Sequence, residues 1–101
     1  MTAHPTTRLD DVVHQRSRLG ILSVLHTIHK VEFTTLRDVL ELTDGNCNRH
    51  LAALDAAGLV KITKSRGPGR ARTWVQLTAP GRAALREEAQ ALQELVATLG
   101  F

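Results

Sequence analysis

The chain has 101 residues, 43% of them hydrophobic, and a formal net charge of +3 at pH 7. This length suits one domain with a small core, and no apolar run of about 18 residues predicts a membrane span. The single cysteine excludes an internal disulfide, and residues 1–11 lack the basic start and apolar run of a signal peptide, so we expect a reducing, cytoplasmic location.

The N-terminal third of the chain is expected to be helical after a short disordered lead. We place this lead at residues 1–7 and a single domain at residues 8–101. Apolar side chains then recur every three or four residues, which predicts one long helix, or two abutting helices, over residues 9–29. An extended segment with two apolar residues follows, Val31 and Phe33.

Two further helices, joined by a short polar turn, are predicted next. Thr35 is the expected N-cap of the first, which ends near residue 42, because Asp38 stands three residues later and can return the hydrogen bond. Either Thr43 or Asp44 can cap the second, since both side chains can accept a hydrogen bond from a free backbone N–H. Gly58 suits the left-handed position that ends a helix.

A β-hairpin and a long helix complete the predicted fold. Apolar residues alternate on either side of the turn "SRGPGRAR", which indicates two strands: Val60 and Ile62 before it, Val75 and Leu77 after it. Thr78 is the expected cap of a last helix, about residues 79–99, with Pro80 tolerated in its first turn. Along that helix apolar residues repeat with the spacing of a helix seam, at Leu85, Ala89, Leu92, Val96 and Leu99. This stripe could cover the domain's own core, join a second copy in a homodimer, or do both.

Positive charge is concentrated in one part of the chain. Residues 56–86 contain seven of the 13 Lys and Arg residues and none of the ten Asp and Glu residues. The other six cations therefore share the rest of the chain with all ten acids. A solvated basic loop would account for this run, but the hairpin turn within it favours a polyanionic partner.

The predicted helix at about residues 44–57 has two unlike faces. On a helical wheel, Cys47, Leu51 and Leu54 share one apolar face. The opposite face carries small and hydrogen-bonding residues: Gly45, Asn46, Asn48, Arg49, Ala52, Ala53 and Ala56. So slim a helix suits the DNA major groove, about 12 Å wide, in which Asn can pair with adenine and Arg with guanine. Two helices joined by a turn of about three residues form a helix-turn-helix.

Four stretches together resemble a winged helix-turn-helix transcription regulator: "RLGILSVL", "FTTLRDVLELTDGN", "HLAALDAAGLV" and "RTWVQLTAPGRAAL". The likeness covers nearly the whole chain from residue 9. It is to small one-domain regulators allied to the multiple-antibiotic-resistance (MarR-like) and arsenic-repressor (ArsR-like) families. It implies a mainly α fold with a small β-hairpin wing, a third helix that reads double-stranded DNA, and terminal helices that form a homodimer. Two-fold symmetry would then require a palindromic operator.

The candidate DNA contacts follow from the helical wheel and from this resemblance. On the reading helix they are Asn46, Asn48, Arg49, Ala52 and Ala53. On the wing, about residues 64–73, they are Lys64, Arg66, Arg70 and Arg72. The candidate dimerisation residues are the apolar stripe of the last helix.

Several residues allow more than one interpretation. Cys47 could be a redox switch near a helix N-terminus or a small apolar core residue. His26 and His29 stand one turn apart and could hold zinc or nickel, but no acidic ligands accompany them and "NCNRH" offers only one thiol, so we expect no metal or other cofactor. His50 should line the edge of the buried face or touch a phosphate. Trp74 should pack at the base of the wing or against a partner chain.

The sequence contains no recognisable catalytic arrangement, and we expect a protein that is not an enzyme. "RGPGR" lacks the strand, helix and Lys-Ser/Thr ending of a phosphate-binding loop, and the few serines have no evident base and carboxylate partners. Two alternatives remain open: a winged-helix module that binds another protein, and a regulator gated by a ligand or by oxidation. The sequence identifies no effector, operator or direction of regulation.

Overall fold

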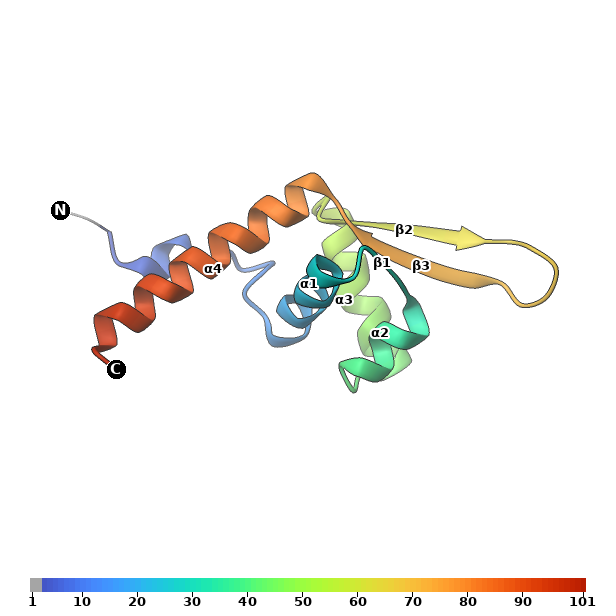
Figure 1. Ribbon diagram of the computed structural model, residues 1–101, viewed down its shortest axis with the longest axis horizontal. Coiled ribbons are helices and arrows are strands. Elements are labelled where there is room, and N and C mark those ends of the chain that lie inside the picture. The colour runs from blue at the N-terminus through green and yellow to red at the C-terminus, as the bar shows by residue number, and fades with distance from the viewer. Residues whose placement is uncertain (1–2) are drawn as a thin grey trace.

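The protein is elongated because a hairpin and a long helix project in opposite directions from three central helices (Figure 1). The computed structural model describes residues 3–101 and measures 59 × 24 × 21 Å. The central helices are α1 (Arg16–Thr27), α2 (Phe33–Val39) and α3 (Asp44–Ala56). The hairpin consists of β2 (Val60–Ser65) and β3 (Arg72–Leu77), and the long helix is α4 (Ala79–Leu99). The predicted fold, mainly α with a β-hairpin wing, is confirmed.

A three-stranded antiparallel sheet fastens the hairpin to the helices. Its order is β1-β3-β2, where β1 (Lys30–Glu32) is the short strand before α2. Val75 is the central residue, because it pairs with Val31 on one side and with Ile62 on the other. The core beneath joins all three central helices to the sheet through Ile21, Leu22, Leu25, Val31, Leu36, Leu51, Leu54, Val60 and Val75. This shared core fixes the direction of α3 relative to the hairpin.

Side-chain caps set the boundaries of the two functional helices as the sequence predicts. Thr43 caps α3, since its Oγ1 accepts a hydrogen bond from Asn46 N at 3.1 Å. Gly58 follows α3 with a left-handed φ of 76°, which a side chain would disfavour. Thr78 caps α4 in the same manner, accepting from Gly81 N at 3.0 Å. Each helix therefore begins immediately after its cap.

The first helix is shorter than the span predicted at residues 9–29. α1 begins at Arg16, where the Gln15 side chain accepts a hydrogen bond from Arg18 N at 2.8 Å. Before it, Asp10 Oδ1 accepts hydrogen bonds from Val12 N at 2.7 Å and Val13 N at 3.3 Å. These local bonds compete with helical pairing. Val13, one of the apolar residues of that spacing, is buried, but the helical backbone predicted around it is wrong.

The second helix also begins earlier than expected. Its first residue is Phe33, and Thr35 is not the cap. Glu32 ends β1 opposite Trp74, and its extended backbone leads directly into the helix. The turn that follows α2 contains Glu41, whose φ of 54° is uncommon for a residue other than glycine.

The lead predicted to be disordered over residues 1–7 is structured in part. Residues 1 and 2 lie outside the described part of the chain. Pro5–Arg8 form a 3-10 helix that contacts α4. Arg8 is ion-paired with Glu87 and Glu94 of α4. These partners are 79 and 86 residues away in the sequence, so the local sequence did not indicate that this segment would be ordered.

Candidate nucleic-acid interface

The helix α3 has one face in the core and the other in solvent, as its wheel predicts. Cys47, Leu51 and Leu54 are buried, with at most 2% of each residue exposed. On the opposite side, four of the predicted DNA contacts are exposed, namely Asn46, Asn48, Arg49 and Ala52. Ala53 is half-buried and lies at the margin of this face. The exposed face thus offers amides and a guanidinium on a narrow backbone.

Polar contacts orient the first turn of α3. Arg49 Nη2 donates a hydrogen bond to Asn46 Oδ1 at 3.1 Å, so these two side chains lie together one turn apart. Arg37 of α2 donates to Asp44 Oδ1 at 2.8 Å and to Asp38 Oδ1 at 2.9 Å. The hydrogen bonds to Asp38 and then to Asp44 raise the pKa of Arg37. The ion pair between Arg37 and Asp44 therefore fixes the first turn of α3 against α2.

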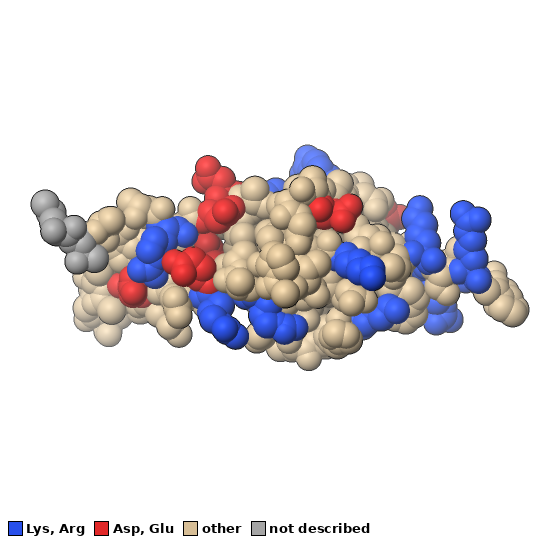
Figure 2. Space-filling model, turned by 90° about the horizontal axis from the view of Figure 1, so that it is seen from above, with Lys and Arg blue, Asp and Glu red and all other residues tan. Residues whose placement is uncertain are grey.

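The hairpin carries the other predicted contacts. All four are exposed: Lys64, Arg66, Arg70 and Arg72. Figure 2 shows Lys and Arg side chains along the hairpin, at the right-hand end of the molecule. Gly69 adopts a φ of 100° in the turn, which requires a residue without a Cβ. Of these four cations, Arg72 alone lies within 4.0 Å of an acid of residues 3–101, since its Nε is 4.0 Å from Glu32 Oε1 at the root of the hairpin. Among residues 3–101 the tip thus forms a basic projection without acidic partners.

A groove separates α3 from the hairpin, and we call it the wing groove. It has a volume of about 530 Å³ and is lined by Phe33, Asn48, Leu51, Ala52, Asp55, Ile62, Lys64 and Thr73. Lys64 and Thr73 are cross-strand partners on the hairpin side, and Asn48, Ala52 and Asp55 form the helix side. The groove brings three predicted contacts from two elements to one surface: Asn48 and Ala52 of α3 and Lys64 of β2.

Five lining residues of the wing groove were not among the predicted DNA contacts: Phe33, Leu51, Asp55, Ile62 and Thr73. Asp55 follows Asn48 by seven residues, so it occupies the same helical face. A stripe drawn through Asn48 and Ala52 would have found it. Phe33, which directly follows β1, is placed by the pairing of β1 with β3, which no local pattern encodes.

His50 lies on the inner edge of α3 and is not available to a phosphate. Only 6% of the residue is exposed, and Arg18 Nη1 donates a hydrogen bond to its Nδ1 at 3.2 Å. Burial, and then the charges of Arg18 and Arg49, lower the pKa of His50. Of the two roles predicted for it, the structural one is therefore correct.

Cys47 is packed as a core residue. The residue is 0% exposed, and burial raises the pKa of its thiol. Both properties oppose reaction with an oxidant, which requires an accessible thiolate. The position therefore favours the apolar interpretation of Cys47 over the redox switch.

The remaining singled-out residues lie apart from the wing groove. His26 and His29 are exposed, and no group of three or more His, Cys, Asp or Glu side chains suited to a metal occurs within residues 3–101. Trp74 is half-buried in the sheet, with Lys30 Nζ 5.5 Å from the centre of its ring. This contact suits a packing role at the root of the hairpin.

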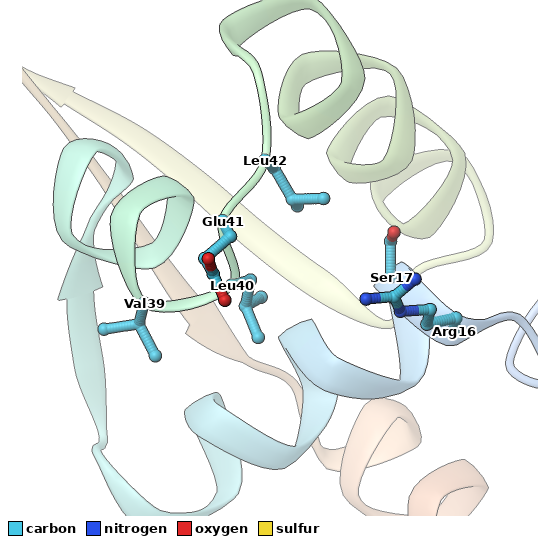
Figure 3. A pocket seen from close by; sticks show the side chains of 6 residues that line it. All are labelled: Arg16, Ser17, Val39, Leu40, Glu41 and Leu42. Atoms are coloured by element: carbon cyan, nitrogen blue, oxygen red, sulfur yellow. The ribbon is translucent and has the colours of Figure 1, made fainter.

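The turn between α2 and α3 borders a second cavity, away from the hairpin. In Figure 3, Arg16 and Ser17 at the start of α1 face Leu40, Glu41 and Leu42 across this cavity. Its volume is about 320 Å³. None of the predicted DNA contacts lines it.

The predicted stripe on α4 is only partly covered. Leu85 and Leu92 are half-buried, and Ala89, Val96 and Leu99 are exposed, the last two by 54% and 55%. The face that packs against the rest of the chain is instead formed by Gly81, Glu88 and Ala91. The stripe therefore does not serve mainly as a cover for the domain's own core.

Glu88 is an unexpected member of that inner face. It is 1% exposed, and His14 Nδ1 donates a hydrogen bond to its Oε2 at 2.6 Å. Its Oε1 has no hydrogen-bond partner among the described residues. A buried carboxylate thus joins α4 to the segment that precedes α1.

A helix-turn-helix beside a cationic hairpin, with amide and guanidinium groups exposed between them, defines a winged helix surface of the DNA-binding class. No helix within residues 3–101 has the length and apolar character to cross a membrane. Similarity to known proteins bears directly on this class.

The winged helix DNA-binding domain family matches residues 17–96. The uncharacterized protein MJ0432 of Methanocaldococcus jannaschii is 39% identical over 69 residues, 68% of this chain and 75% of that protein. A transcriptional regulator homologue from Pyrococcus horikoshii OT3 is similar in structure, with a TM-score of 0.88 and 29% identity over 95% of this chain and 96% of the other. A MarR-family transcriptional regulator from Silicibacter pomeroyi shares the fold, with a TM-score of 0.68 and 19% identity over 95% of this chain and 64% of the other.

Because the family match spans most of the chain, this protein belongs to the winged helix DNA-binding domain family. Its structural neighbours are transcriptional regulators and include a MarR-family member. The predicted resemblance to winged helix transcriptional regulators, MarR-like ones among them, is confirmed, and the class it indicates is a DNA-binding regulator.

Proposed function

We propose that this chain is a homodimeric transcriptional regulator that binds a palindromic DNA duplex sequence-specifically. In this proposal α3 lies in the major groove, and the hairpin contacts the phosphate backbone or the adjacent minor groove. The observation that carries the proposal is the wing groove, in which Asn48 of α3 and Lys64 of the hairpin line one open surface. A helix with side chains is about 10–12 Å across and the major groove about 12 Å wide.

The first test is affinity for random-sequence duplex as a function of salt. A dimer that neutralises about six to ten phosphates should lose about 10³–10⁵ in affinity between about 50 and 200 mM salt. A gel-shift titration at low salt therefore also separates this proposal from the winged-helix module that binds protein. No shift, or an affinity that does not change with salt, would exclude the proposed mechanism.

The second test separates base reading from backbone contact. Arg49 lies on the exposed face of α3, where a guanidinium can fork to guanine, so Arg49→Ala should relax preference at one base position by about 1–3 kcal/mol. Arg70 lies in the hairpin turn, so Arg70→Ala should weaken binding to all sequences alike and, because the dimer loses both copies, reduce the salt slope by about 2. Identical behaviour of the two variants in gel shifts with specific and random duplexes would refute this division.

The dimer part of the proposal rests on the stripe of α4. The exposed side chains of Val96 and Leu99 continue the half-buried Leu85 and Leu92 along one helix edge. Such a stripe, with a seam repeat, can pack against its own copy around a two-fold axis. The two copies of α3 should then meet half-sites about 34–36 Å apart, or a multiple of this distance.

A ligand-gated regulator is a second candidate, favoured by one cavity. A space of about 250 Å³ between α1 and α4 is lined by two arginines, a histidine and two apolar residues: Arg82, Arg86, His26, Leu85 and Ala89. This lining suits a one-ring organic acid, and two of its residues belong to the stripe. Benzoate, as a probe, should raise the unfolding midpoint of the wild type more than that of Arg86→Gln, and an equal response would remove the candidate.

A further inference from the structure

Asp55 is an acidic side chain on the surface proposed to bind a polyanion. It lines the wing groove together with Asn48 and Ala52 of the same helix. The three positions are separated by four and three residues, which places them on one face of α3. Asp55 therefore points into the same space as the amide of Asn48.

The position is unfavourable for folding. Asp55 stands in the last turn of α3, which ends at Ala56. The C-terminus of a helix carries partial negative charge, so a carboxylate there is disfavoured, and Asp is a poor helix former. Asp44, the other acid of α3, stands in the first turn and is paired with Arg37 at 2.8 Å. No Lys, Arg or His nitrogen of residues 3–101 lies within 4.0 Å of the Asp55 carboxylate.

The position is also unfavourable for contact with phosphate, because like charges repel across the same groove. Phosphate offers only hydrogen-bond acceptors, whereas some base edges also carry hydrogen-bond donors. The N4 amino group of cytosine is a donor in the major groove, and the carboxylates of Asp and Glu accept from it. Resting on the proposed function, we propose that Asp55 determines sequence specificity by accepting a hydrogen bond from the N4 amino group of a cytosine.

The helix geometry gives the expected spacing of the site. Seven residues separate Asn48 from Asp55, a rise of about 10 Å along the helix. This distance matches about three base-pair steps of 3.4 Å. A helix lying along the groove would then read an adenine at Asn48 and a cytosine about three base pairs away at Asp55.

The experiment is selection of bound duplexes from a randomised pool by the full chain. The variants are Asp55→Asn and Asp55→Ala, compared with wild type and with Asp11→Asn as the control. Asp11 is also an exposed acid, and it belongs to the segment that precedes α1. Figure 1 shows this segment on the side of the central helices away from the hairpin. The control removes one negative charge without touching the wing groove.

The duplexes selected by the wild type should share a C·G pair at one position. Those selected by Asp55→Ala should show no preference at that position. Those selected by Asp55→Asn should prefer a different base there, for example adenine. Single-site titrations should show a preference of about 5- to 150-fold for that pair in the wild type and none in Asp55→Ala. With wild-type protein, N4-methylation of the selected cytosine should weaken binding to a similar extent. Both Asp55 variants should melt at the same temperature as wild type or about 1–6 °C higher.

Two results would overturn the inference. One is an unchanged site in both Asp55 variants, and the other is an equal rise in affinity for every sequence, as simple loss of repulsion would give. Either leaves the proposed function intact as long as wild type and Asp11→Asn select the same site. Failure of the wild type to select any duplex would instead refute the proposed function.

Discussion

Gly81 lies where α4 leaves the sheet, and a methyl group there should destabilise the protein strongly. An added Cβ would lie 2.0 Å from Leu59 O and 2.9 Å from Leu77 Cδ1. The carbonyl of Leu59 is held in place because it also accepts a hydrogen bond from Thr78 N at 3.1 Å. Gly81→Ala must therefore displace the first turn of α4.

The cost has two parts. Forcing a methyl group into a packed site costs about 1–3 kcal/mol. Displacing the turn also weakens the cap, in which Gly81 N donates to Thr78 Oγ1 at 3.0 Å, and a cap contributes about 1 kcal/mol. The sum is about 2–4 kcal/mol, which lowers the unfolding midpoint of a domain of this size by about 10–30 °C.

Thermal and urea unfolding followed by circular dichroism measure this effect, with Gly45→Ala as the matched control. Gly45 lies in α3, and a Cβ there would meet nothing within 4 Å. The same chemical change should therefore leave stability unchanged or raise it by up to about 1 kcal/mol. If Gly81→Ala were as stable as wild type, the close approach of α4 to the Leu59 carbonyl would be wrong.

Three further predictions concern buried and exposed side chains. Burial and the charges of Arg18 and Arg49 lower the pKa of His50 from 6.5, so at acidic pH the unfolded chain binds a proton that the folded chain does not. The free energy of unfolding, measured with urea, should therefore fall as pH drops below about 6.5. In His50→Gln it should change less steeply with pH. The Cys47 residue is 0% exposed, so its thiol should react with a thiol reagent only at the rate at which the protein unfolds. Mild peroxide should likewise leave DNA affinity unchanged. If peroxide lowered the DNA affinity of the wild type but not that of Cys47→Ser, the redox switch would be the correct interpretation. Val96→Glu should be a monomer in sedimentation velocity. The fold of the single chain should lose little stability, because 54% of Val96 is exposed within one chain. If Val96→Glu remained a dimer, the stripe of α4 would not be the interface.

The parts of the fold that sequence reasoning predicted depend on contacts between residues close in the chain. The caps Thr43 and Thr78 and the helix-ending Gly58 act within one or two turns, so their chemistry can be read directly. The same holds for the outward face of α3, because helical periodicity alone separates Asn48 and Arg49 from the core.

The parts that it missed depend on pairing between distant segments. Glu88 breaks the apolar pattern of α4, yet it is buried because His14, 74 residues earlier, donates to it. The wing groove likewise exists only because the sheet brings Lys64 and Thr73 opposite α3. No local pattern specifies such a contact.

One segment connects the helix proposed to read DNA with the helix proposed to dimerise. Arg18 holds the segment before α1 by donating to the carbonyl oxygens of Asp11 and Val12, while its Nη1 donates to His50 of α3. Two residues beyond Val12, His14 donates to Glu88 of α4. Arg18 is thus bonded both to this segment and to α3, and the segment is bonded to α4 through His14, so a displacement of α4 relative to α3 must stretch or break one of these polar contacts. In the proposed dimer, the distance between the two copies of α3, on which half-site spacing depends, would therefore be set by these polar contacts as well as by the apolar stripe.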